Sequence, residues 1–227
     1  MPNRWVPITV MTLAALGLLA AIISISVGEE GGQAIEIDEV GEVQQLTGGI
    51  RQLGERLGDD DAAVALTLFT DVQCPRCAAY QADVVDPLIE EYVRTGGAKI
   101  NFKNFPLGLK PVTLGAIAVV AAAEEQDRGW QYAEVFMRNL DAVPDRGVTQ
   151  EFLDEVAAVT PKLDTGLWEG DVISDQARAK AEADVELATD LRLSADPAIV
   201  VDGANGSETL EEAPSLEAVV AAMDRVR

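Results

Sequence analysis

The two cysteines of the chain, Cys74 and Cys77, are the residues whose type and spacing could do chemistry. They are the only cysteines in 227 residues, and Pro75 and Arg76 separate them in the stretch LFTDVQCPRCAAY (68–80). A pair spaced in this way can exchange disulfides with other thiols, supply half of a metal site, or form a small structural crosslink. The surrounding sequence discriminates between these three uses.

The composition argues against a metal site and against several kinds of catalysis. The protein contains no histidine, which excludes Ser-His and Cys-His nucleophile pairs, histidine-ligated zinc and haem held by histidine. Two cysteines cannot form a four-thiolate zinc site within one polypeptide, so a metal would need mixed cysteine and carboxylate ligands or a second polypeptide. A structural crosslink is disfavoured as well, because a disulfide that closes so short a loop removes little entropy from the unfolded state. We therefore expect a redox-active pair and no bound metal.

The elements on either side of the pair place Cys74 at the start of a helix. The apolar run AVALTLF (63–69) predicts a buried strand, and apolar residues at helical spacing after the pair predict a helix. Pro75 then occupies the first helical position, where its missing N–H costs nothing. The unpaired N–H groups of the helix start and the cation of Arg76 both favour the thiolate of Cys74. Because they stabilise the reduced form, the pair should oxidise other thiols, with Cys77 facing inward as the resolving cysteine.

The remaining pattern predicts an α/β fold with a helical insertion. The first helix should be kinked at Pro87, and AKINF (98–102) predicts the next strand. A helical insertion at about 110–191 precedes the strand PAIVVDG (197–203) and a weak strand near ETL. The helices predicted after the second strand are 111–126, 130–140, 149–159, 174–191 and 215–226. The order is therefore β-α-β, a helical block, then β-β-α.

The folded domain is predicted to occupy residues 50–227. Residues 28–49 are rich in glycine and acids and contain few large apolar side chains, so they predict a linker with a short helix around Val43–Leu46. The net charge of −22 argues against nucleic acid as a partner, because a protein binds phosphates by neutralising them with cations.

Residues 1–27 predict a transmembrane helix or a signal segment. The run 5–27 carries no charge and is long enough, at 1.5 Å per residue, to cross a hydrocarbon core of roughly 30 Å. Arg4 precedes this run and acidic residues follow it, so the positive-inside rule places the cysteine pair outside the cytoplasm, where disulfides persist. We expect a single-pass anchor in the cell membrane with an extracytoplasmic catalytic domain. Ser24 and Ser26 also fit a cleavage site, and cleavage would make the protein secreted.

The sequence resembles a DsbA-like member of the thioredoxin superfamily, of the membrane-tethered or secreted bacterial kind. The resemblance rests on GERLGDDDAAVALTLFTDVQCPRC, EEYVRTGGAKINFKNFPLG, the alanine-rich helical insertion and LRLSADPAIVVDG, which together span about residues 50–227. It implies a thioredoxin-like fold with the insertion between its halves and a cis-proline, here Pro197, that faces the cysteine pair. It also places Asp196 in the site with Pro197, because the family uses backbone groups of this loop to pair with a substrate strand.

The resemblance further implies an activity and its partners. It implies a thiol–disulfide oxidoreductase that exchanges its Cys74–Cys77 disulfide with thiols of exported proteins, acting as an oxidase. A quinone-coupled membrane protein would reoxidise it, and no organic cofactor would be needed. Two alternatives stay open: a reductase or isomerase with the same site, and a membrane-tethered binding or chaperone module whose disulfide is inert.

Two positions depart from the family pattern. The position six residues before the first cysteine often carries a buried acid that moves protons at the buried sulfur, and here it is Leu68. The residue before the cis-proline is usually threonine or valine, and here it is Asp196. Two arrangements follow from the sequence. Either Asp196 faces Cys74 and disfavours its thiolate, or it pairs with Arg76 and much of the effect of both charges cancels.

Overall fold

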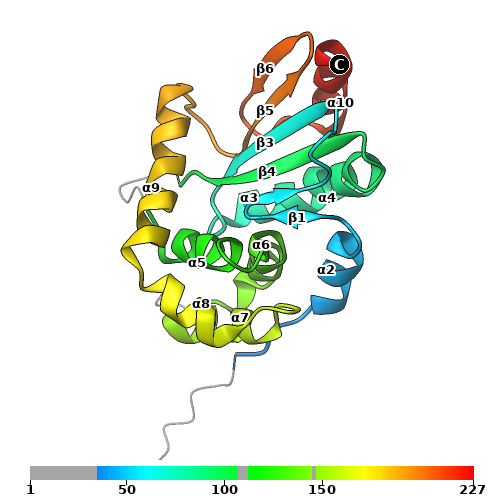
Figure 1. The fold of residues 1–227 in the computed structure, drawn as a ribbon. Helices are drawn as coiled ribbons and strands as arrows, with labels where there is room; N and C mark the ends of the chain where they lie inside the picture. The colour runs from blue at the N-terminus through cyan, green and yellow to red at the C-terminus, as the bar shows by residue number, and fades with distance from the viewer. Residues whose placement is uncertain (1–34, 107–111, 145–146) are drawn as a thin grey trace, which may run out of the picture. The chain divides into compact units, whose positions relative to one another are not determined.

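A six-stranded sheet runs through the residues that this computed structural model describes, which are 35–106, 112–144 and 147–227 (Figure 1). The spatial order of the strands is β1-β2-β4-β3-β5-β6, and β3 and β4 pair in parallel, whereas the other neighbours are antiparallel. Because a parallel pair needs a crossover connection, the segment between β3 and β4 forms a helix. The strands are β1 (Gln52–Leu53), β2 (Arg56–Leu57), β3 (Val64–Thr70), β4 (Ala98–Asn104), β5 (Ala198–Gly203) and β6 (Gly206–Leu210).

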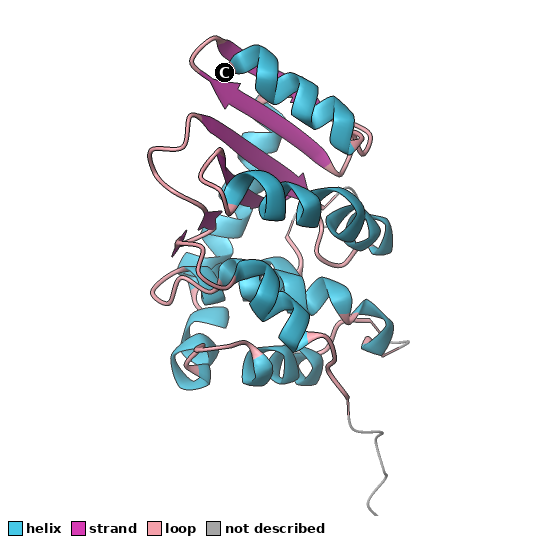
Figure 2. Ribbon diagram, turned by 90° about the vertical axis from the view of Figure 1, so that its right-hand side faces the viewer, coloured by secondary structure: helices cyan, strands magenta, loops and turns pink. Residues whose placement is uncertain are grey.

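The helices divide into a run after β3, an inserted group between β4 and β5, and two helices outside these groups. The run after β3 comprises α3 (Pro75–Tyr80), η1 (Gln81–Val85), α4 (Asp86–Leu88) and η2 (Ile89–Val93). The inserted group comprises α5 (Leu114–Ala123), α6 (Gly129–Arg138), η3 (Leu140–Ala142), α7 (Gln150–Val159), α8 (Thr165–Val172) and α9 (Asp175–Asp190). Before the sheet comes α2 (Val40–Thr47), and the last helix, α10 (Leu216–Val226), packs against β5 and β6 (Figure 2).

The helical run from Pro75 to Val93 is continuous, because each of its elements begins where the preceding one ends. Two of these elements, η1 and η2, are π-helical. Pro87 lies in α4, between them, and has no N–H to donate to the preceding turn. We expected a kink at Pro87; the structure has π-helical turns on either side of it, and both proline and such turns are places where helices bend.

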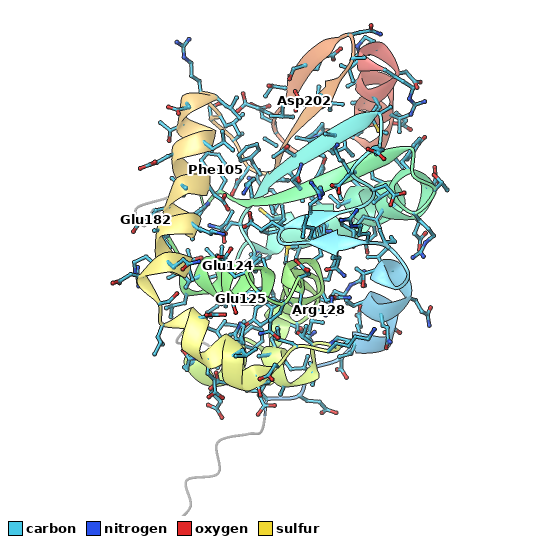
Figure 3. All side chains as sticks on the ribbon, in the orientation of Figure 1. Phe105, Glu124, Glu125, Arg128, Glu182 and Asp202 are labelled. Atoms are coloured by element: carbon cyan, nitrogen blue, oxygen red, sulfur yellow. The ribbon has the colours of Figure 1, made fainter. Side chains whose placement is uncertain are left out.

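Side chains on the central strands alternate between two faces of the sheet, so each face carries a core. Leu66 and Leu68 of β3 belong to the main core, whereas Phe69 belongs to a smaller cluster. That smaller cluster contains Phe69, Phe105, Ala188, Leu193, Ala198 and Val200. Phe105 lies where α9 approaches the sheet (Figure 3). The cluster therefore attaches the helical insertion to the strands that lead into the cysteine pair and out of the cis-proline loop.

The observed order of elements confirms the predicted α/β arrangement with its helical insertion, and it also differs from the prediction in places. The β1–β2 hairpin and α8 were not predicted; strands of two residues and a helix of eight give too few repeats for a periodic signal. The compact unit begins at Ile35 rather than at residue 50, because α2 buries Val43 and Leu46 against the core. The expected linker 28–49 is thus folded over its second half.

The membrane prediction concerns residues that the structure leaves undescribed. The segment 1–27 lies outside the described residues. Among the helices of the described part, none combines the length and the apolar character that crossing a bilayer requires.

Candidate active site

The cysteine pair lies at the carboxyl end of β3, where the helical run begins. Asp71 shapes the connecting turn: its backbone carbonyl accepts a hydrogen bond from Cys74 N–H at 3.1 Å, and its carboxylate accepts one from Gln73 N–H at 2.9 Å. Cys74 is the N-cap of α3, and its Sγ accepts a hydrogen bond from Cys77 N–H at 3.3 Å. Pro75 occupies the start of the helix, as the sequence predicted. The turn therefore holds the first sulfur over the unpaired N–H groups of the helix start.

The two sulfurs have different surroundings. Cys74 is half-buried and Cys77 is 1% exposed, and both are free thiols. Burial raises the pKa of the Cys77 thiol to about 12, and its hydrogen bond with Cys74 and the charge of Asp196 act in the same direction. The Asp71 N–H and the Thr70 hydroxyl donate to this sulfur and lower its pKa in part. Cys74 is therefore the accessible sulfur, and Cys77 stays protonated at neutral pH behind it.

The loop before β5 brings Asp196 and Pro197 to the pair, across a sequence separation of 119 residues between Cys77 and Asp196. The Asp196–Pro197 peptide bond is cis. Asp196 is 5% exposed; its Oδ2 lies 3.8 Å from Cys77 Sγ, and its Oδ1 lies 2.7 Å from a guanidinium nitrogen of Arg76. Arg76 also donates to the backbone carbonyl of Asp196. One guanidinium group thus holds both the side chain and the backbone of this residue.

The same loop is fixed from the other side by Glu211. One carboxylate oxygen of Glu211 accepts hydrogen bonds from the backbone N–H groups of Ser194, at 2.6 Å, and Ala195, at 3.1 Å. These bonds, together with that from the Ser194 hydroxyl, lower the pKa of Glu211, so the anchor stays charged at neutral pH. Glu211 therefore holds the two residues before Asp196, and Arg76 holds Asp196 itself, which together fix its position beside the cysteines.

The structure brings the six predicted site residues together: Cys74, Pro75, Arg76, Cys77, Asp196 and Pro197. Of the two arrangements left open by the sequence, the Arg76–Asp196 pair is the one observed, and the sulfur in hydrogen-bond contact with the carboxylate is that of Cys77. Thr70 and Asp71, which contact the Cys77 sulfur, were not among the predicted site residues. Their signal was available, because they are the polar residues that end the buried strand leading to the pair.

Within the described residues, one group of cysteine and acidic side chains is close enough to share a metal ion, and it consists of Cys74, Cys77 and Asp196, with potential donor atoms within 4.8 Å of one another. This is the mixed cysteine and carboxylate set that the composition left open. It supplies three donors, fewer than the four of a closed structural zinc site, and Arg76 places a fixed cation on the carboxylate. We therefore treat these residues as a thiol site and not as metal ligands.

The helical insertion contacts the active site on two sides. The Gln73 side chain accepts a hydrogen bond from Gly115 N–H at 2.9 Å, and a Cβ at Gly115 would lie 2.8 Å from a methyl group of Val72, so glycine is needed for this close approach. On the other side of the pair, a hollow of about 420 Å³ adjoins the start of α3. It is lined by Pro75, Ala78, Met137, Arg138, Leu140 and Asp141. Residues of the insertion therefore border both the turn before Cys74 and the helix start after it.

A buried carboxylate cluster lies one turn further along the same helical run. Glu134 of α6 is fully buried, and it accepts a hydrogen bond from the Gln81 side chain at 2.6 Å. Arg138 lies 3.5 Å from Glu134 and 2.9 Å from Glu39, and it pairs with Asp86 as well. Burial and the charge of Asp86 raise the pKa of Glu134 to about 8, and burial raises that of Asp86 to about 6, although Arg138 opposes both shifts.

Comparison with known proteins agrees with this geometry. The family model described as Thioredoxin matches residues 53–225. The probable disulfide bond formation protein D of Bacillus anthracis is 30% identical over 151 residues, which cover 66% of this chain and 70% of that protein. The fold is similar to that of BdbD from Bacillus subtilis (oxidised), with a TM-score of 0.64 at 21% identity over 76% of this chain and 91% of the other. DsbA from Chlamydia trachomatis gives the same TM-score and coverage at 18% identity.

Proposed function

We propose that this protein, which belongs to the thioredoxin family and is a DsbA-like thiol–disulfide oxidoreductase, acts as an oxidase of thiols in exported proteins. In its cycle, a substrate thiolate attacks Cys74 Sγ in the Cys74–Cys77 disulfide, and the pair of electrons from the broken bond stays on Cys77. A second substrate thiolate then releases the mixed disulfide. The substrate leaves with a disulfide, and the enzyme leaves as a dithiol that must be reoxidised.

The observation that supports this proposal most is the unequal burial of the two sulfurs at one helix start. Cys74 is accessible and caps the helix, whereas Cys77 is 1% exposed. An attacking substrate thiolate can reach only the outer sulfur, so the mixed disulfide forms there and the inner sulfur is the leaving group. The Cys77 N–H at the helix start donates to Cys74 Sγ at 3.3 Å, and a donor at this sulfur favours the reduced enzyme and makes the disulfide oxidising.

Trapping of mixed disulfides tests the division of roles between the cysteines. In Cys77→Ala, Cys74 can still form a mixed disulfide but nothing resolves it, so adducts with substrate proteins should accumulate. In Cys74→Ala, the remaining sulfur is buried and adducts should be absent. If neither variant accumulates adducts while peptide binding persists, the protein is instead the binding or chaperone module with an inert disulfide.

The reduction potential of the pair tests the direction of electron flow. The full-length protein is equilibrated with glutathione buffers, and the fraction of Cys74–Cys77 disulfide is measured after acid quenching and thiol alkylation. An oxidase requires a potential well above that of thioredoxin, which is about −270 mV. A value near that of thioredoxin would rule out the oxidase and favour the reductase or isomerase, which uses the same two sulfurs.

The same proposal includes a location and a redox partner. An uncharged run at 5–27 supports an anchor in the cell membrane, or a cleaved signal, with the catalytic domain outside the cytoplasm. A quinone-coupled membrane protein is the proposed electron acceptor for the dithiol. Protease added to intact, wall-stripped cells should digest the domain if it faces outward, and protection of the domain until the cells are lysed would contradict this location.

A further inference from the structure

The carboxylate of Asp196 connects a buried sulfur of the active site, that of Cys77, with the exposed side chain of Arg76. Oδ2 lies 3.8 Å from Cys77 Sγ, and Oδ1 lies 2.7 Å from Arg76. The Asp196 side chain is 7% exposed, whereas that of Arg76 is 63% exposed. The carboxylate therefore reaches from the buried sulfur to a side chain in contact with solvent.

Cys77 must exchange a proton each time the disulfide opens or closes. The residue is 1% exposed, so solvent has little direct access to that proton, and burial raises the pKa of the thiol to about 12, so the sulfur is protonated at neutral pH when the enzyme is reduced. Leu68, at the position where a proton-moving acid is often found in thioredoxin-like proteins, is packed in the main core. The proton of Cys77 therefore needs another route.

Among the described groups that face the Cys77 sulfur, only one can carry its proton near neutral pH. In the described part of the protein they are the Thr70 hydroxyl, the Asp71 N–H, the Asp196 carboxylate and Cys74, which is its partner in the disulfide. Neither a hydroxyl nor a backbone amide ionises near neutral pH. The charged groups around Asp196 itself are Arg76, which pairs with it, and the Asp71 carboxylate, whose pKa is raised by burial and, to a smaller extent, by the charge of Asp196.

We propose that Asp196 is a catalytic residue that carries the proton to and from Cys77, and this inference rests on the oxidoreductase function proposed above. In the oxidising direction, a substrate thiolate attacks Cys74 Sγ, the bond between the two enzyme sulfurs breaks, and its electron pair remains on Cys77 Sγ. Asp196, protonated from solvent, passes its proton to this sulfur and returns to a carboxylate.

Release of the mixed disulfide is the second step, and it completes the transfer of electrons and protons. A second substrate thiolate attacks the substrate sulfur of the mixed disulfide, and Cys74 leaves with the bonding pair. Two substrate thiols have then lost two electrons and two protons. The enzyme disulfide has gained the electrons, and Cys77 has regained one of the protons through Asp196. In the reverse direction, the Asp196 carboxylate takes the Cys77 proton as this sulfur attacks Cys74.

A charge effect and a proton-transfer effect of Asp196 have opposite signs, which makes the proposal testable. If Asp196 acts only as a negative charge, replacing it with asparagine favours the Cys77 thiolate and speeds ring closure. If Asp196 carries the proton, the same replacement removes the carrier and slows ring closure. General acid–base groups typically contribute about 10²–10⁴-fold to rates, so even a partial loss should exceed the charge effect.

The experiment follows ring closure in a glutathione mixed disulfide. Reduced full-length protein is mixed with oxidised glutathione, quenched with acid at intervals and analysed by mass spectrometry. This separates the attack of Cys74 on glutathione from the later attack of Cys77 on Cys74. For Asp196→Asn we expect ring closure at least about tenfold slower at pH 7. The rate should also rise more steeply with pH than in the wild type, because hydroxide then has to remove the proton.

A second variant provides a readout that a structural role would not change. In Asp196→Ala, formate can occupy the space of the missing carboxylate and transfer the proton itself. Ring closure should accelerate in proportion to the formate concentration, whereas chloride at the same ionic strength should have no effect. The matched control compares Cys77→Ala with Cys77→Ala/Asp196→Asn, in which only the attack of Cys74 is measured and its change can be subtracted. Urea unfolding of each variant verifies that it is folded.

The outcomes separate this inference from the proposed function. If the wild type forms the mixed disulfide and closes it, but Asp196→Asn closes it at the same rate or faster with the same pH dependence, Asp196 is not the proton carrier and the function stands. Absence of formate rescue in a folded Asp196→Ala protein would also overturn the inference. If the wild type itself neither forms nor closes the mixed disulfide, the oxidoreductase function fails instead.

Discussion

Two arginine–carboxylate groups contact the same helical run, and they differ in how charge is balanced. At the start of the run, Arg76 pairs with Asp196 alone among the described residues, and the arginine side chain is 63% exposed. Further along the run, Arg138 of α6 contacts Asp86; this arginine is 20% exposed and is shared by Asp86, Glu134 and Glu39. The first group has one cation for one acid. The second has one cation for three acids.

This difference separates a reactive carboxylate from structural ones. Burial and the charge of Asp86 raise the pKa of Glu134 to about 8, and Arg138 opposes this shift only in part, so the fully buried Glu134 is mostly protonated at neutral pH. Asp196 is balanced by its own cation and has its second oxygen turned towards a sulfur. Burial of an acid beside an arginine is therefore not enough for chemistry; the acid also needs a reacting atom and a path to solvent.

The largest expected effect of a substitution is on stability, when each arginine is replaced by an uncharged side chain of similar length. Arg138→Met leaves the carboxylates of Glu134 and Asp86 buried without a cation, which should cost about 3 kcal/mol of the free energy of unfolding. Arg76→Met leaves one buried carboxylate, that of Asp196, without its cation, but Arg76 is itself largely in solvent, so the loss should be clearly smaller. Urea unfolding at pH 7.5 measures both. Equal losses of unfolding free energy in the two variants would show that the two arginine–carboxylate groups do not differ in how their charges are balanced.

The second prediction concerns pH. An acid whose pKa is higher in the folded than in the unfolded protein binds more protons when folded, so the free energy of unfolding falls as the pH rises. Glu134, raised from 4.5 to about 8, and Asp86, raised from 3.8 to about 6, both have this sign. The stability they contribute should be lost as the pH rises through 6 and then 8, in total by about 4 kcal/mol between pH 5.5 and 8.5.

Glu134→Gln isolates this pH dependence from that of the other acids. The glutamine keeps an oxygen for the Gln81 amide but cannot ionise, so the variant should be more stable than the wild type at pH 8.5 and should show a flatter profile. Glu208→Gln is the matched control: hydrogen bonds from Arg225 lower the pKa of this acid, so its replacement should leave the slope between pH 5.5 and 8.5 unchanged. A profile of Glu134→Gln as steep as that of the wild type would mean that the pH dependence arises elsewhere.

Much of the fold follows from patterns that are local in the sequence. The strand AVALTLF, the proline after Cys74 and the spacing of apolar residues after Cys77 are each visible without a structure, and they place the pair correctly at a strand–helix junction. Short elements give no such signal, which is why the β1–β2 hairpin and α8 were missed. The extent of α2 could not be predicted either, because its few apolar residues are buried by contacts with elements far away in the sequence.

The residues of the active site could be predicted from the sequence, but the contacts between their side chains could not. The residue types suggested that Asp196 and Arg76 would interact, but which sulfur the carboxylate contacts depends on how the cis-proline loop is oriented. The Glu134–Arg138 cluster is a stronger example. An acid and a base four residues apart on a helix usually form a solvent-exposed pair. Here Glu134 is fully buried because α2 and α3 pack against α6 and the Gln81 side chain of η1 reaches Glu134, which no local pattern reveals.

The smallest expected effect is on the redox equilibrium, and it tests whether the charges at the active site cancel. Arg76→Met leaves the Asp196 carboxylate unbalanced beside the two sulfurs, which disfavours thiolates and the reduced form. The equilibrium constant for oxidising glutathione should therefore fall by about three- to tenfold, and tenfold corresponds to about 30 mV for a two-electron couple. Asp196→Asn leaves the cation unbalanced and should raise the constant. The double variant restores neutrality and should return to within about threefold of the wild type, because the two changes oppose each other. If both single variants shift the equilibrium in the same direction, the pair does not act through its charges, and the contrast with the Arg138 cluster would lie in burial alone.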